Sequence, residues 1–223
     1  MSKNWWKYLC SIFLIYTVIA GLLFPVPRLV ILHETIRNLY FHVPMWFCMI
    51  ALFGTSVVNA IMYLYKEDEI NDIRSVEYIN TGIVFGICGL ITGSIWARFT
   101  WGAWWVFSDP KLNGAAVVML EYLAYLILRG SITDEKQRAK VSAVYNIFAC
   151  ASIIPLLFIL PRMTDSLHPG NGGNPAFSKY DLDSAMRLVF YPAVMGWVML
   201  GVWIASIRVR LRKIENIVHE NEN

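Results

Sequence analysis

Two histidines and a crowded group of tryptophans are the residues of this 223-residue chain whose types and spacing could do chemistry. His42 lies in the string Y-F-H-V-P at the edge of an apolar segment, and His168 lies in L-H-P-G, just before a Pro-Gly turn. Between them, residues 96–113 read W-A-R-F-T-W-G-A-W-W-V-F-S-D-P-K-L-N and hold four of the nine tryptophans. Imidazole nitrogens bind metals, and indoles offer flat apolar surface that is typical of a membrane–water boundary.

Together these residues match the requirements of a haem, which takes an axial nitrogen on each side of the iron and aromatic surface against the macrocycle. A zinc or copper site would need further thiolate, carboxylate or histidine ligands nearby. The four cysteines all fall inside apolar segments and form no C-x-x-C pair, so they do not supply such ligands. Two simpler interpretations stay open: an ordinary aromatic belt, and histidines that only hydrogen-bond their neighbours. His33 and His219 are expected to be surface residues.

The composition predicts an all-α integral membrane protein, because 57% of the residues are apolar and only 16% are charged. Six apolar segments approach the roughly 20 residues that cross a bilayer, and the fourth is short. They lie near residues 8–25, 42–65, 79–97, 114–129, 141–160 and 185–207. The net charge of +3 is too small and scattered to indicate nucleic-acid binding, and no G-x-x-x-x-G-K nucleotide loop is present.

The basic residues predict how the chain is oriented in the membrane. Twelve of the 19 lysines and arginines fall on the side that holds both termini, the loop at 66–77 and the loop at 129–140. By the positive-inside rule, both termini are cytoplasmic. The tryptophan stretch, His42 and His168 then share the opposite side. We expect one six-helix domain over residues 1–223, with outward loops at about 98–113 and 162–184.

The string W-G-A-W-W-V-F-S-D-P-K-L resembles the tryptophan-rich WWD motif of the haem-handling proteins of cytochrome c maturation, in particular the CcmC family. The resemblance extends over about residues 38–187, through Y-F-H-V-P at 40–44, T-G-S-I-W-A-R at 92–98, L-H-P-G at 167–170 and D-S-A-M-R at 183–187. The chain departs from the motif at Phe107, where the family commonly has tryptophan, and at Ser108, which adds one residue before the aspartate.

The resemblance implies a site for a non-covalent haem b. His42 and His168 would be the axial ligands of the iron. Four basic residues on the outward side are candidates to pair with the anionic propionates, Arg98, Lys111, Arg162 and Arg187, with Arg187 as our first choice. The same resemblance implies an outer platform formed by Trp101, Gly102, Trp104, Trp105 and Asp109.

The resemblance also implies a role, a set of partners and a location. The protein would sit in the bacterial inner membrane with its haem site on the periplasmic side, and would present haem to the chaperone CcmE. CcmA, CcmB and CcmD would be the other partners besides the lipid bilayer. No catalytic acid, base or nucleophile is identified, so it is open whether the protein is an enzyme. The alternatives are a permease subunit of a membrane transporter, or a haem oxidoreductase, for which the inner halves of the helices lack histidines.

Overall fold

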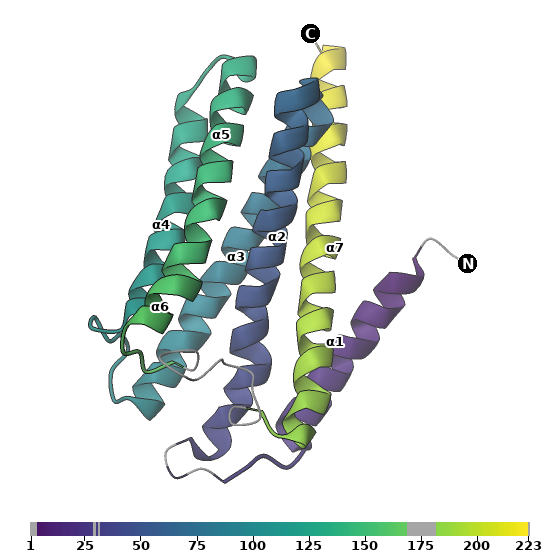
Figure 1. Cartoon of the computed structure of the whole chain (residues 1–223). Coiled ribbons are helices and arrows are strands. Elements are labelled where there is room, and N and C mark those ends of the chain that lie inside the picture. The colour runs from purple at the N-terminus through teal and green to yellow at the C-terminus, as the bar shows by residue number, and fades with distance from the viewer. Residues whose placement is uncertain (1–3, 29, 31, 169–181, 223) are drawn as a thin grey trace.

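The computed structural model describes residues 4–28, 30, 32–168 and 182–222, and the described part of the chain is helical, without strands. The helices form a bundle in which neighbours in sequence run antiparallel (Figure 1). Their bounds are α1 Trp5–Leu23, the 3-10 helix η1 His33–Asn38, α2 Leu39–Lys66, α3 Glu69–Thr100, α4 Pro110–Ser131, α5 Glu135–Ile153, the π-helical η2 Ile154–Ile159, α6 Leu160–Met163 and α7 Ser184–Glu222.

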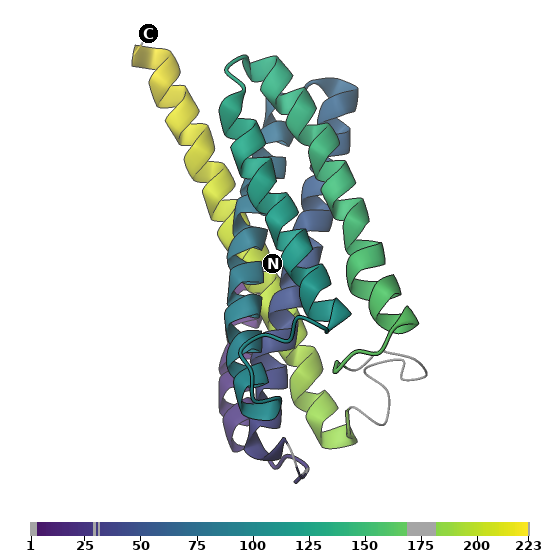
Figure 2. The ribbon, with the colours of Figure 1, turned by 90° about the vertical axis from the view of Figure 1, so that its left-hand side faces the viewer.

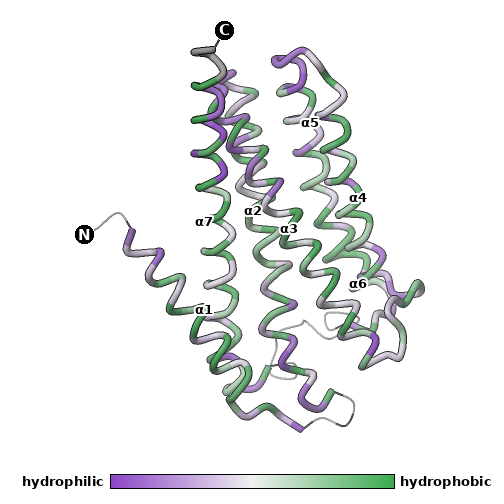
Figure 3. The backbone as a smooth tube through the Cα atoms, turned by 180° about the vertical axis from the view of Figure 1, so that it is seen from behind, coloured by the Kyte–Doolittle hydropathy of each residue, from purple (hydrophilic) through white to green (hydrophobic). Residues whose placement is uncertain are grey.

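Six stretches of helix in the described chain are long and apolar enough to cross a membrane, as the sequence predicts. They span Trp5–Leu23, His33–Lys66, Glu69–Thr100, Pro110–Ser131, Glu135–Met163 and Ser184–Val218. Apolar side chains are exposed along the outside of the bundle, for example Ile15 and Phe148, as the hydrocarbon of a bilayer requires. Hydrophilic residues concentrate toward the ends (Figure 3). The protein is therefore an all-α, multi-pass membrane protein.

Aspartates fix where several helices begin. Asp68, Asp109 and Asp134 each accept a hydrogen bond from a backbone N–H of the first turn that follows, at 2.7–3.1 Å. Such caps satisfy N–H groups that have no partner inside the helix. In α4 the next residue is Pro110, whose fixed φ suits the first helical position. The connection between α3 and α4 is therefore 101–109, and the two ends of the tryptophan stretch, 96–100 and 110–113, belong to α3 and α4.

Helix α2 lies at the centre, against α3, α5 and α7, while α1 packs chiefly on α7 and its N-terminal end diverges from the bundle (Figures 1 and 3). The main apolar core forms around α2 with side chains from α3, α4, α5, η2 and α7, and within it the rings of Phe53 and Tyr122 stack with centroids 3.5 Å apart. The loop expected at 162–184 follows α6, which ends at Met163, and precedes α7, which begins at Ser184. Its residues 169–181 lie outside the described part.

Buried polar groups are paired toward the end of the bundle where α2 ends and α3 begins. The Asn146 amide donates to the Ser56 hydroxyl at 2.8 Å, and the Arg129 guanidinium donates to Asp72 at 2.9 Å. Unpaired, such groups would be costly away from water. Fixed polar contacts therefore hold this end of the bundle together, and the opposite end carries the residues singled out from the sequence.

Candidate functional site

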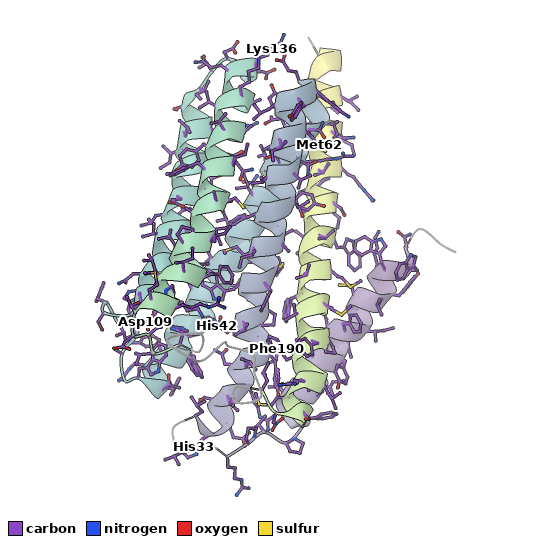
Figure 4. The ribbon with its side chains drawn as sticks, viewed as in Figure 1. His33, His42, Met62, Asp109, Lys136 and Phe190 are labelled. Atoms are coloured by element: carbon purple, nitrogen blue, oxygen red, sulfur yellow. The ribbon has the colours of Figure 1, made fainter. Side chains whose placement is uncertain are left out.

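A cavity of about 430 Å³ lies at the end of the bundle where α2 begins and α3 ends. Figure 4 labels His42 and Asp109 at this end of the molecule and Lys136 at the other. The lining is mostly apolar and comes from η1, α2, α3, α4, η2, α7 and both loops. It includes His42, Trp46, Gly93, Trp96, Trp101, Trp105, Lys111, His168 and Met186. The fold thus brings together the two histidines that the sequence separates by more than 120 residues.

His42 is held by the facing helix α3. Its Nδ1 lies 3.1 Å from the Gly89 carbonyl oxygen and 3.1 Å from the Thr92 hydroxyl. Because a carbonyl oxygen only accepts, the hydrogen bond to Gly89 requires the proton on Nδ1 and leaves Nε2 with a lone pair. A Cβ on Gly93 would lie 2.7 Å from Cε1 of His42, so the ring fits only because residue 93 is glycine.

His168 stands beside the loop at residues 101–109, which we name the WWD loop after the motif that it resembles. Its ring meets the Trp101 ring edge-on, with centroids 4.9 Å apart, and Trp101 in turn lies 5.4 Å from Trp96. Nδ1 of His168 faces Asp109 Oδ1 at 3.4 Å, a contact between charges or dipoles rather than a well-formed hydrogen bond. The histidine side chain is 20% exposed, so it remains at the edge of the cavity.

Asp109 joins the two loops as well as capping α4. Oδ1 accepts from the N–H groups of Lys111 and Leu112, both at 3.0 Å. Oδ2 accepts from the Ser166 hydroxyl at 2.9 Å and the Leu167 N–H at 2.7 Å. Burial by itself raises the pKa of Asp109, but His168 and these N–H donors outweigh it and hold the pKa well below its ordinary value. The carboxylate is therefore charged and fixes the segment that carries His168.

The glycine of the motif sets the course of the WWD loop. Gly102 has a φ of +76°, a conformation that is strained for other residues, and its carbonyl accepts from Arg98 Nη1 at 2.7 Å. The turn sends Trp101 and Trp105 toward the cavity, whereas Trp104 is 59% exposed and does not line it. Trp105 donates from Nε1 to the Asn113 side chain at 3.4 Å.

Arg187 does not line the cavity. Its Nε donates to the Leu182 carbonyl at 3.1 Å, near the start of α7. Among the described residues that form the wall, Lys111 is the one lysine or arginine. Three further lining residues, Trp46, Gly93 and Met186, were not singled out from the sequence, because apolar positions on a membrane helix reveal a cavity only once the packing is known.

The sequence matches the family model described as "Heme exporter protein C" over residues 1–223. Proteins named heme exporter protein C are similar to it: that of Haemophilus influenzae is 23% identical over 82% of this chain and 73% of its own length, and that of Escherichia coli K12 is 22% identical over 78% and 69%. The cytochrome c biogenesis protein CcsA of Prochlorococcus marinus is 37% identical over 42% of this chain and 29% of its own. Because the family model covers the whole sequence, this chain belongs to the CcmC, or heme exporter protein C, family.

Proposed function

We propose that this membrane protein acts in cytochrome c maturation by holding a non-covalent haem b in the cavity, with His42 and His168 as its axial ligands. The observation that carries the proposal is the orientation of both imidazoles. In each ring Nδ1 faces an oxygen, of Gly89 and Thr92 for His42 and of Asp109 for His168. Metal-binding histidines characteristically direct their second nitrogen at a carbonyl or carboxylate in this way, which leaves Nε2 for the iron.

The wall of the cavity suits a large aromatic ligand. Its volume of about 430 Å³ falls within the range of small-molecule sites. Trp96, Trp101 and Trp105 supply flat apolar surface, and the buried Nε1 of Trp96 has no hydrogen-bond partner among the described residues. For the propionates we favour Lys111, which already lines the cavity, as the first cation. Arg187 remains a second candidate that would have to leave the Leu182 carbonyl.

The exposed part of the WWD loop supports presentation of the ligand to another protein. Trp104 is 59% and Phe107 is 83% exposed, on the loop whose other indoles face the cavity. We propose that the recipient is the haem chaperone CcmE, that CcmA, CcmB and CcmD complete the assembly, and that the site faces the periplasm from the bacterial inner membrane. The chain's contribution would be positioning, since its cavity offers ligands and surface rather than a reactive nucleophile.

The test is the absorption spectrum of the detergent-purified protein in wild-type form and as His42→Ala and His168→Ala. The wild type is expected to show a Soret band. Each substitution removes one axial ligand, so the haem-to-protein ratio after washing should fall on the order of tenfold, and the band should shift in the haem that remains.

His33→Ala is the matched control, because His33 is exposed, lies near the same end of the molecule and does not line the cavity (Figure 4). It should keep the wild-type spectrum. Full haem occupancy in either cavity variant, or no Soret band in folded wild-type protein supplied with hemin, would overturn the proposal.

A further inference from the structure

A second cavity, of about 480 Å³, opens at the opposite end of the bundle between α2, α3 and α7. Three cationic side chains line it, Arg74 from α3 and Arg210 and Lys213 from α7. The remaining wall includes the polar side chains of Asn59, Tyr78 and Ser206. The lining of this cavity thus differs from that of the first, because cationic and polar side chains stand where the first cavity has indoles.

Neighbouring arginines at this end are neutralised by acids. Arg208 and Arg212 both approach the buried Glu77, at 2.7 and 3.4 Å, and Arg129 pairs with Asp72. Arg74, Arg210 and Lys213 differ, since none of them has a hydrogen bond or a carboxylate within 4 Å in the part of the chain that the structure describes. Three like charges around one hollow repel one another, and an anion placed between them would relieve that repulsion.

The cavity lies at the level where a membrane meets water. The apolar stretch of α7 ends at Ile207, which is exposed on the outside of the bundle, and Arg210 and Lys213 come within the next two turns. In Figure 3 hydrophilic residues gather at the ends of α2 and α3 and alternate with apolar residues along the end of α7. Phospholipid phosphates occupy this boundary layer, and basic pockets between transmembrane helices are suited to their headgroups.

We propose that this second cavity binds the headgroup phosphate of an anionic phospholipid from the surrounding bilayer. Each guanidinium can meet two phosphate oxygens, Lys213 adds a point charge, and the hydroxyl of Tyr78 offers a neutral donor. A lipid held there would tie α7 to α2 and α3 at the end where α7 extends away from the other helices (Figure 2). The proposal is independent of the haem site, since no described residue lines both cavities.

The experiment is native mass spectrometry of the full chain in detergent, titrated with phosphatidylglycerol or phosphatidylcholine. The wild type is compared with the triple variant Arg74→Gln, Arg210→Gln and Lys213→Gln. Each basic group at an anionic surface contributes about a factor of five to binding. The triple variant should therefore bind phosphatidylglycerol on the order of 100-fold more weakly, and the wild type should prefer it to phosphatidylcholine.

The matched control is the triple variant Lys66→Gln, Lys136→Gln and Lys140→Gln, which removes the same charge at the same end of the bundle but outside the cavity. It should bind phosphatidylglycerol as the wild type does. An equal loss of phosphatidylglycerol binding in both triple variants would show that general surface charge causes the binding, and would overturn the proposal. So would equal retention of the two lipids, or displacement of the lipid by millimolar inorganic phosphate, which would indicate a site for a free anion.

Discussion

Asp109 shows how one side chain can serve both a helix and a site. Through Oδ1 it caps α4, and through Oδ2 it holds the backbone that leads to His168. The resemblance to the WWD motif predicts that Asp109 belongs to the aromatic platform. The Asp-Pro pair was a signal of the cap, because aspartate before a proline is typical of a helix start. The bonds to Ser166 and Leu167 carried no such signal, since they join residues more than 50 positions apart.

We predict that Asp109→Ala destabilises the folded protein by about 3 kcal/mol, because it removes a cap worth about 1 kcal/mol and leaves buried donors on the second loop without an acceptor. Asp134→Ala is the control, since Asp134 caps α5 through Gln137 and is exposed. It should cost only about 1 kcal/mol. The free energies of unfolding can be measured by titrating SDS into mixed micelles. Equal losses in the two variants would show that the cross-loop bonds contribute nothing.

The difference in unfolding free energy between the wild type and Asp109→Ala depends on pH, because folding lowers the pKa of Asp109. The pKa of folded Asp109 lies below its ordinary value of 3.8, so the charged carboxylate stabilises the folded state fully above pH 3.8. That contribution is lost as the pH falls through the folded pKa. The gap in stability between the wild type and Asp109→Ala should therefore be constant at neutral pH and shrink only in strong acid.

The contact between α2 and α3 is organised by a row of glycines on α3. Gly82, Gly89 and Gly93 leave room for Phe53, Trp46 and His42 of α2, and Gly86 leaves room for Met119 of α4 as well as Met49 of α2. Small residues at this spacing let membrane helices approach closely. The row ends at His42, so the packing of the two helices also decides where that imidazole stands.

We predict that Gly93→Ala moves the His42 ring, because the new Cβ would lie 2.7 Å from Cε1. If His42 ligates haem, the haem-to-protein ratio should fall on the order of tenfold, as for His42→Ala. Gly54→Ala is the control, since a Cβ there meets nothing within 4 Å. It should keep the Soret band, while circular dichroism reports the helix content of both variants. A Gly93→Ala protein with unchanged haem would show that the ring has room to shift without losing its ligand role.

The six helices could be predicted from the sequence because each must present a long apolar run to lipid, whatever it packs against. The observed helices extend beyond the runs, as in α3, which starts at Glu69 rather than near residue 79. The first turn of α3 is polar because it lies outside the lipid, so no apolar run marks where this helix begins. The lining of the first cavity by Trp46 and Met186 depends on which helix faces which, and an apolar residue looks the same toward lipid or toward a cavity.

At the scale of the whole molecule, the two ends of the bundle differ in chemistry. One end has indoles, two histidines and the buried Asp109 around an apolar cavity, and the other has paired acids and arginines beside a cationic cavity. The distribution of charge predicts that the cationic end is cytoplasmic, since basic residues are retained on that side of a membrane. The fold is compatible with either insertion, so the side stays a prediction.

Labelling with a membrane-impermeant maleimide in spheroplasts can decide the orientation. We predict that Ser108→Cys, on the exposed part of the WWD loop, reacts in intact spheroplasts, whereas Lys136→Cys, at the start of α5, reacts only after lysis. The four native cysteines lie within the membrane-spanning helices, where lipid shields them from an aqueous reagent, so the wild type should stay unlabelled and serve as control. The reverse pattern would place the histidine cavity in the cytoplasm, and haem presentation to a periplasmic chaperone would then be impossible for this protein.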